Sequence, residues 1–414
     1  MALDGGHFTR RMKDLGDVLA IRPFRLFSIG NFCSLSAIWI IRVCIGWLTW
    51  EMTSSKTWLG ALAFAELGPS VIISLYAGAL ADRLDRVRIL RLGQSLQVLL
   101  ALALVALKLS GALNVWWMLV IMFGFSIIGG INLPARLSVT PALVGREHLA
   151  TASAVGSITL NLTRLLGPLI AAPLLVLNYE PQAFALAAIG FAVNARCLTL
   201  IRPEERAAAS VVTTAEVIGV SFADVMRDLW NHKLLRLVLL IQIFTSLLVR
   251  PLTDMLPAFS GQVFHRDEAG YALLTSCVGI GAIFGALFVV GQAAGRAMRF
   301  HILIGSAIFA LSMVAFAAVD HFGLALLLLL SFGAAMTSSG IAGTTFVQVH
   351  TPLDRLGRVM SVYSIVYRLA PALGALALGA MADLVSLRAA TIVLPCIALA
   401  VLAAVWRSFL DEAT

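Results

Sequence analysis

Apolar stretches alternate with short polar segments along almost the whole chain. An apolar helix of about 20 residues spans roughly 30 Å, the thickness of the hydrocarbon core of a bilayer. The pattern therefore predicts an all-α integral membrane protein. It predicts twelve transmembrane helices, near residues 24–50, 57–81, 88–110, 114–134, 150–177, 181–201, 234–258, 268–291, 299–319, 322–346, 356–382 and 387–407.

The overall composition supports a membrane location. Of the 414 residues, 60% are hydrophobic and only 13% are charged, and the mean hydropathy is +0.94. A water-soluble core of this length could not bury so much apolar surface. Membrane lipids are therefore expected to surround the protein.

Basic residues are unevenly distributed between the two sides of the predicted membrane. The first 23 residues carry Lys and Arg but no short apolar core with a cleavage site, so we expect no cleaved signal peptide and a cytoplasmic N-terminus. The positive-inside rule agrees, and an even number of spans returns the C-terminus to the cytoplasm. The net charge of +8 then reflects topology and predicts no nucleic-acid partner. Of the 30 Lys and Arg residues, only four fall on predicted outer loops: Lys56, Lys108, Arg266 and Arg388.

A long polar stretch separates the sixth and seventh predicted spans and divides the protein into two halves of six spans each. The predicted organisation is a cytoplasmic N-terminal segment, an N-terminal six-helix bundle, a cytoplasmic central loop, a C-terminal six-helix bundle and a cytoplasmic tail. Their predicted limits are 1–23, 24–201, 202–233, 234–407 and 408–414.

Several functional classes lack their required motifs. The cysteines and histidines are scattered without ligand spacing, which predicts no metal site and no cofactor. The chain has no Walker A sequence, so ATP is not expected as the direct energy source. We also find no nucleophile with an accompanying base, as an intramembrane enzyme would need.

A dense group of charges lies between the second and third spans. The pattern Gly78-x-Leu80-Ala81-Asp82-Arg83-x-x-Arg86 resembles the signature loop of the major facilitator superfamily. The resemblance implies two pseudo-symmetric six-helix bundles that alternate access to a central site, in a monomer of the bacterial inner membrane. In physical terms, we expect Gly78, Asp82, Arg83 and Arg86 to form a latch, because the Asp82 carboxylate can pair with arginines and with a helix N-terminus.

Three further phrases resemble one branch of that superfamily, which contains enterobactin-type siderophore exporters and macrolide efflux pumps. They are NLPARLSVTPALVGREHL (132–149), RPLTDMLPAF (250–259) and RLGRVMSVYSIVYRLAPALG (355–374). The phrase RLLGPLIAAP (164–173) resembles the Gly-Pro motif of superfamily antiporters, although alanines replace the glycines that usually follow.

Four arginines lie deep inside predicted spans: Arg42, Arg164, Arg250 and Arg368. The offsets of 208 residues (Arg42 to Arg250) and 204 residues (Arg164 to Arg368) suggest that each half presents two arginines to a shared cavity. A charge that faces lipid costs at least ~2.5 kcal/mol, so these side chains should point inward. A proline follows three of them closely, which favours kinks that border the cavity. We expect them to bind an anionic substrate.

Two acids, Glu66 and Asp254, also lie well inside spans. Glu66 should lie at the depth of Arg42, and Asp254 follows Arg250 by one helical turn, so the sequence predicts the pairs Arg42–Glu66 and Arg250–Asp254. These pairs could carry protons during transport or could simply hold helices together.

The resulting hypothesis is a secondary transporter, a proton-coupled exporter of an organic anion such as a siderophore. Two alternatives remain open at this point. One is a multidrug or macrolide efflux pump, and the other is a transporter of an anionic lysophospholipid-like amphiphile.

Overall fold

The structure is a computed structural model that describes residues 16–81, 85–145, 148–201, 232–289, 296–351 and 353–411. Within these ranges, twelve helical segments are long and apolar enough to cross a membrane. The predicted all-α fold with twelve spans is therefore confirmed.

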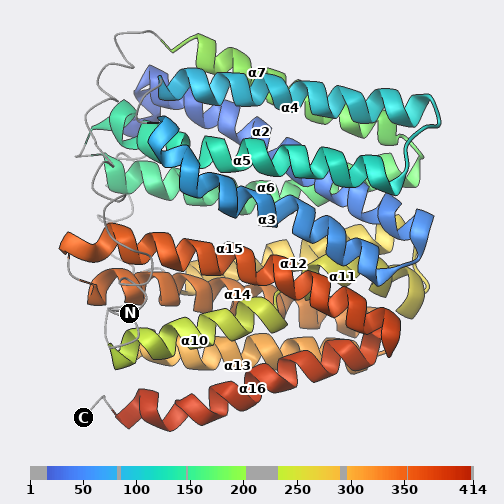
Figure 1. The fold of residues 1–414 in the computed structure, drawn as a ribbon, viewed down its shortest axis with the longest axis vertical. Helices are drawn as coiled ribbons and strands as arrows, with labels where there is room; N and C mark the ends of the chain where they lie inside the picture. The colour runs from blue at the N-terminus through green and yellow to red at the C-terminus, as the bar shows by residue number, and fades with distance from the viewer. Residues whose placement is uncertain are drawn as a thin grey trace.

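The first six spanning helices form one bundle, drawn from blue to green in Figure 1. Short turns connect successive helices, so neighbours in sequence run in opposite directions. The bundle consists of α2 (Arg22–Thr53), α3 (Lys56–Ala81), α4 (Arg86–Leu109), α5 (Val115–Val144), α6 (Leu149–Val176) and α7 (Glu180–Thr199).

The remaining helices form a second bundle beside the first, drawn from yellow to red in Figure 1. Its first span is interrupted into α10 (Lys233–Leu248), α11 (Leu252–Ala258) and the π-helical turn η3 (Phe259–Val263). The other spans are α12 (Glu268–Val289), α13 (Arg296–Ala318), α14 (Phe322–His350), α15 (Leu353–Leu384) and α16 (Leu387–Asp411).

The interruption after α10 has a local cause. Pro251 has no N–H to donate, and its ring crowds the preceding turn, so a regular helix cannot continue through it. The helix breaks directly at Arg250, as the sequence predicts for this proline. Pro168 and Pro371 lie inside the continuous helices α6 and α15, and the kinks expected at these two prolines stay predictions.

The fourth span is longer than the sequence predicts. The predicted span ends at residue 134, yet α5 continues to Val144 with both Pro134 and Pro141 inside it. The extension carries Arg136 into a helix interior, where it lies beside the central cavities.

The two ends of the molecule differ. The start of α2 and the end of α16 lie at the same end, on the left of Figure 1, and we call this the terminal end. At the opposite end, an ion pair closes each bundle: Lys108 contacts Glu180 at 3.1 Å between α4 and α7, and Arg388 contacts Asp320 beside α16. These pairs occupy equivalent places in the two halves, as pseudo-symmetry requires.

The halves meet along two seams, α3 against α15 and α6 against α12. Glycines allow the close approach. A Cβ at Gly60 would overlap the carbonyl of Ala375, and one at Gly279 would lie only 3.3 Å from the carbonyl oxygen of Arg164. The α3–α15 contact involves the first turn of α3, so this seam is tight at the opposite end.

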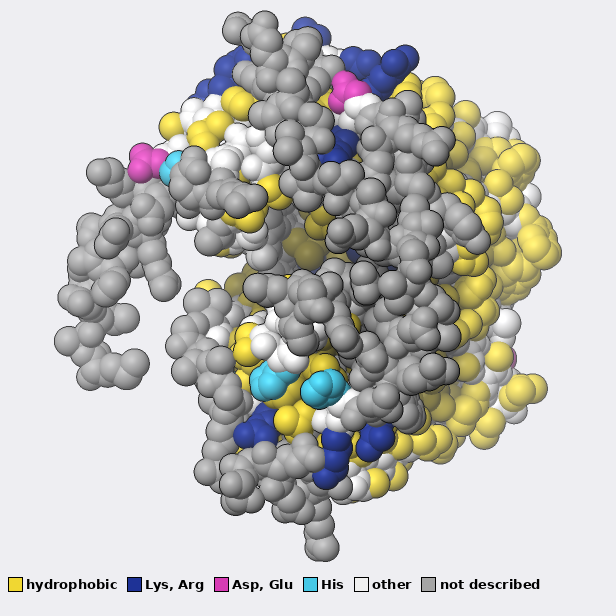
Figure 2. All heavy atoms as spheres, turned by 60° about the vertical axis from the view of Figure 1, so that its left-hand side comes forward, with side chains coloured by type: hydrophobic (Ala, Val, Ile, Leu, Met, Phe, Trp, Pro, Cys, Tyr) yellow, Lys and Arg dark blue, Asp and Glu magenta, His cyan; other side chains and the backbone are white. Residues whose placement is uncertain are grey.

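Large apolar side chains cover the flanks of the bundle, as expected for a surface in contact with lipid tails. Figure 2 shows this surface as the yellow flank. Examples are Leu99, Val120, Phe284, Leu287 and Phe288. The same view, turned towards the terminal end, shows a recess near the centre of that face.

The predicted domain limits stay predictions. Residues 1–15, most of the central loop (202–231) and residues 412–414 lie outside the described residues.

Candidate functional site

Arg42 of α2 lies between two acids that come from different halves. Its Nη2 donates to Oδ1 of Asp254 on α11 at 2.7 Å, and its Nε lies 3.4 Å from Oε2 of Glu66 on α3. The structure therefore contains the predicted Arg42–Glu66 pair. The other predicted pair is wrong, because among the described residues Asp254 pairs with Arg42 and not with Arg250. The helix break at Pro251 explains the difference, since the regular spacing that would align Arg250 with Asp254 is lost.

Arg250 has a different environment. Its guanidinium carbon lies 4.5 Å from the ring centroid of Tyr367, and its Nη1 donates to the Tyr367 carbonyl at 3.4 Å. Both contacts lie within the C-terminal half. A guanidinium stacked on an aromatic face keeps its edge N–H groups available, so Arg250 can still bind an anion.

Of the three arginines Arg42, Arg164 and Arg250, Arg164 of α6 has the fewest hydrogen-bond and carboxylate partners among the described residues. Its guanidinium lies 5.5 Å from the ring centroid of Trp39, which also lies 5.0 Å from the guanidinium of Arg42. Among the described residues, the buried Nε of Arg164 has no hydrogen-bond partner. A buried donor without a partner costs free energy, which a bound acceptor would recover.

These groups line a small central pocket of about 80 Å³ between the two halves. Arg42 and Arg164 come from the N-terminal half, and Arg250 and Asp254 from the C-terminal half. Tyr271 of α12 also lines the pocket. The expectation that both halves present arginines to one cavity therefore holds for three of the four predicted arginines.

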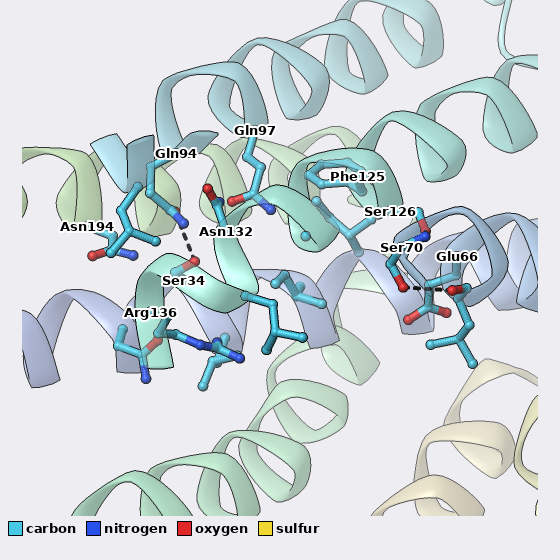
Figure 3. Close-up of a pocket in the computed structure, with 18 of the residues that line it drawn as sticks. Ser34, Glu66, Ser70, Gln94, Gln97, Phe125, Ser126, Asn132, Arg136 and Asn194 are labelled. Carbon is cyan, nitrogen blue, oxygen red and sulfur yellow. Dashed lines mark hydrogen bonds between the residues drawn. The ribbon is translucent and has the colours of Figure 1, made fainter. Parts of the chain in front are cut away.

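The fourth arginine, Arg368, lines a larger cavity of about 220 Å³ that extends into the N-terminal half. Arg136 and Glu66 line the same cavity, and Figure 3 shows these two side chains among its walls. Arg136 was not predicted as a site residue because it lies two residues beyond the predicted end of the fourth span at residue 134. The phrase that contains it, NLPARLSVTP, was already noted as a family signature.

A third cavity, of about 330 Å³, continues from the second towards the terminal end. The two share Phe27, Asn31, Leu35 and Arg136. The third cavity also touches Phe24, near the first turn of α2, and Leu149, where α6 begins. A chain of cavities therefore leads from Glu66 towards the terminal end.

The charged side chains of the first two cavities do not balance. Five arginines (Arg42, Arg136, Arg164, Arg250 and Arg368) face two carboxylates (Glu66 and Asp254), which leaves a net charge of +3 when all are ionised. In a region of low dielectric, such an excess favours binding of an anion strongly.

The opposite end is closed by a contact between the halves. Asp383 of α15 caps the N-terminus of α3. It accepts from the Ser55 hydroxyl at 2.7 Å and from the backbone N–H groups of Thr57 at 2.8 Å and Lys56 at 3.2 Å. The Lys56 ammonium lies 3.5 Å from the same carboxylate. A carboxylate at a helix N-terminus is favourable because it satisfies unpaired N–H groups and opposes the helix dipole.

The predicted latch falls partly outside the structure. Asp82 and Arg83 lie outside the described residues, whereas Gly78 belongs to α3 and Arg86 is the first residue of α4. Asp85 caps α4 by accepting from the backbone N–H groups of Val87 and Arg88. Asp85 is therefore the N-cap residue of α4.

Within the described ranges, no group of three or more His, Cys, Asp and Glu side chains is arranged to hold a metal ion.

The family model of transmembrane secretion effectors matches residues 18–413 of the chain. The chain belongs to this family. The chain is thus a secondary transporter of the major facilitator superfamily, related to siderophore exporters, and not an enzyme.

Several known transporters are similar in sequence to this chain. The enterobactin exporter EntS of Citrobacter koseri is 25% identical over 374 residues, which cover 86% of this chain and 85% of the exporter. EntS of Salmonella typhi is 27% identical over 367 residues, with the same coverage. The staphyloferrin A transporter of Staphylococcus aureus (strain NCTC 8325 / PS 47) is 26% identical over 166 residues, which span 40% of this chain and 42% of that transporter.

Solved structures share the fold at low sequence identity. The nucleoside transporter NupG superposes with a TM-score of 0.72 at 12% identity, covering 94% of this chain and 99% of NupG. A bacterial homologue of the human lysosomal transporter Spinster, in an inward-facing and unoccupied conformation, gives 0.69 at 16% identity, covering 97% and 98%. These likenesses establish the fold of the major facilitator superfamily.

Proposed function

We propose that this protein exports an organic anion, such as a siderophore, across the bacterial inner membrane in exchange for protons. The observation that carries the proposal is the net charge of +3 in the two inner cavities, together with the unpartnered Nε of Arg164. The similarity to the enterobactin exporters and to the staphyloferrin A transporter supports a siderophore as the anion.

The shape of the structure suits loading from inside the cell. With the terminal end in the cytoplasm, the chain of cavities leads from the cytoplasm to Glu66, and the Asp383 cap closes the outer side. This is the conformation in which an exporter takes up its substrate. Arg136 and Arg368 would meet the anion first, and Arg164 and Arg250 lie further in.

The Arg42–Asp254 ion pair lies at the central pocket and connects the two halves, so it opposes their separation on the outer side. An anion that binds Arg42 competes with Asp254 for it, so loading would weaken this contact and favour the outward-facing state. After release, a proton from outside would neutralise Asp254. When the halves close again, Arg42 pairs with Asp254 and the proton passes to Glu66, which faces the cavity that leads to the cytoplasm.

The groups that surround this relay come from several helices. Arg42 contacts both acids, and Arg164, Arg250 and Tyr271 line the same pocket as Asp254. An anion or a conformational change that takes Arg42 away would leave both acids free to exchange a proton. Glu66 and Asp254 are therefore assigned to proton coupling, and the arginines to substrate binding.

Reconstitution into phospholipid vesicles tests this function. We expect an imposed pH gradient to drive transport of enterobactin or staphyloferrin A, and we expect the Arg164→Gln, Arg368→Gln double variant to lose it. Erythromycin tests the macrolide alternative, and a lysophosphatidylglycerol tests the amphiphile alternative. Transport of erythromycin that is equal in the wild type and the double variant, with no siderophore transport, would contradict the proposal.

A further inference from the structure

The cavity of about 220 Å³ that Arg136 and Arg368 line also contains a group of uncharged amide side chains. Gln94 and Gln97 of α4, Asn132 of α5 and Asn194 of α7 converge on it, as Figure 3 shows. All four are buried, with exposed fractions of 7%, 3%, 9% and 5% respectively. We call these four residues the amide cluster.

Three of these amides carry a buried oxygen that is not satisfied. Among the groups that the structure describes, Oε1 of Gln97, Oδ1 of Asn132 and Oδ1 of Asn194 have no hydrogen-bond partner. Only Gln94 is paired through its oxygen, which accepts from the Ser34 hydroxyl at 2.9 Å. Buried polar groups are almost always paired in folded proteins, so these three oxygens can still accept a hydrogen bond from water or from a bound group.

Close packing holds two of the amides in place. Asn132 lies against Gly93, and Asn194 against Gly30, so closely that a Cβ on either glycine would overlap the amide. Their positions are therefore fixed by the helix contacts, which is the arrangement expected of a preformed binding site.

The C-terminal half pairs its buried amide side chain, Gln242, with the backbone. Gln242 lies 208 residues after Ser34, the same offset that relates Arg42 to Arg250, and its Nε2 donates to the Ser339 carbonyl at 3.1 Å. The nearby Tyr363 hydroxyl accepts from Thr344 at 3.3 Å. The buried amide of Gln242 is therefore paired within the protein, whereas three of the four amides in the cluster keep an oxygen without a partner among the described residues. Buried hydroxyls without a partner occur in both halves of the described structure, at Ser36 in one half and at Ser276, Ser306 and Thr337 in the other.

We propose that the amide cluster is a binding subsite for hydroxyl groups of the transported anion, while Arg136 and Arg368 hold its carboxylate. A hydroxyl can donate to an unpaired amide oxygen and can also accept from an amide nitrogen. The inference rests on the proposed anion transport and narrows the substrate class to anions that carry hydroxyl groups.

A matched pair of small anions tests the subsite. Citrate carries three carboxylates and one hydroxyl, and tricarballylate is the same molecule without the hydroxyl. Calorimetric titration of the purified full chain in detergent, at fixed low salt, gives both affinities. We expect the wild type to bind citrate about tenfold more tightly, the discrimination of one buried hydrogen bond.

Substitutions then show which side chains cause the preference for citrate over tricarballylate. Asn132→Leu and Gln97→Met remove an amide at nearly constant shape, and each should bring citrate affinity close to that of tricarballylate. Arg136→Gln should weaken both anions to a similar degree. Asn161→Leu is the matched control, because Asn161 lines none of the three cavities and its amide donates to Ser157 on its own helix. It should leave both affinities unchanged.

Thermal unfolding separates binding from packing. If the amides only hold helices together, Asn132→Leu and Gln97→Met should lower the melting temperature of the ligand-free protein. If the amides instead bind a ligand, the melting temperature of the ligand-free variants should equal or exceed that of the wild type, because the substitution removes an unsatisfied buried group.

The outcomes distinguish this inference from the proposed function. Equal binding of citrate and tricarballylate by the wild type would overturn the hydroxyl subsite while leaving anion binding intact. A citrate preference that survives both amide substitutions would also overturn it. Binding of neither anion would count against the anion cavity itself, and the subsite would fall with it.

Discussion

Arg42 and Asp254 belong to different halves of the transporter, and the guanidinium Nη2 of one donates to the carboxylate Oδ1 of the other at 2.7 Å. They lie 212 positions apart in sequence. Glu66 contacts the same guanidinium from the N-terminal half. One arginine therefore connects an acid that faces the cavity leading to the terminal end with an acid on the seam between the halves.

Neutralising either acid should uncouple transport from protons. In vesicles, Glu66→Gln and Asp254→Asn should lose most of the accumulation driven by a pH gradient but keep downhill exchange of substrate, because the amides cannot carry a proton. Asp320→Asn removes an ion pair within one half and serves as the control. Equal loss of uphill and downhill transport would indicate that the pairs are purely structural.

The Asp383 cap should hold the opposite end closed. Asp383→Ala removes a helix cap worth about 1 kcal/mol, which corresponds to a roughly fivefold shift towards the open state. Spin labels placed through Ser54→Cys and Val385→Cys, in a background without native cysteines, would report the distance across this end. In Asp383→Ala, we expect a larger fraction of molecules to show a long distance between the two spin labels. An unchanged distance distribution would mean that the cap does not contribute to closure.

The latch predicted from the sequence can be tested although Asp82 lies outside the described residues. Asp82→Asn removes a charge without a change in volume, so we expect strongly reduced transport at a normal level of protein in the membrane. The measurement is initial transport rate per quantity of protein. Rates equal to the wild type would refute the latch.

The geometry of the arginines predicts a graded response to substitution. Arg164→Lys replaces a planar fork with a point charge and should weaken anion binding about tenfold, whereas Arg164→Gln should weaken it about 100-fold. Binding can be followed by the fluorescence of Trp39, which lies over Arg164. If lysine and glutamine had equal effects, the fork geometry would be irrelevant.

Much of the fold could be predicted because bilayer thickness sets helix length, and the sequence records that length directly. The span that begins at residue 22 was predicted at 24, and α12 begins at Glu268 as expected. The helix α5 extends beyond the predicted end at residue 134, with Pro134 and Pro141 inside it, because packing between helices tolerates proline inside a membrane span.

The site was less predictable than the fold. Charges at equal depth correctly suggested that Arg42 meets Glu66, because α2 and α3 are neighbours joined by a short turn. The contact between Arg42 and Asp254 could not be predicted from spacing, since it depends on how the two halves meet. The amide cluster appeared in the sequence only as separate polar residues, because their convergence requires the packing of α4, α5 and α7.

The central claim is that arginines from both halves bind an anion. Its most direct test is calorimetric titration of enterobactin or staphyloferrin A, at fixed low salt, into the wild type and the Arg164→Gln, Arg368→Gln double variant. We predict that the wild type binds one of these anions and that its affinity falls by at least about 100-fold in the double variant. Equal affinity in the two proteins would contradict an anion-binding cavity.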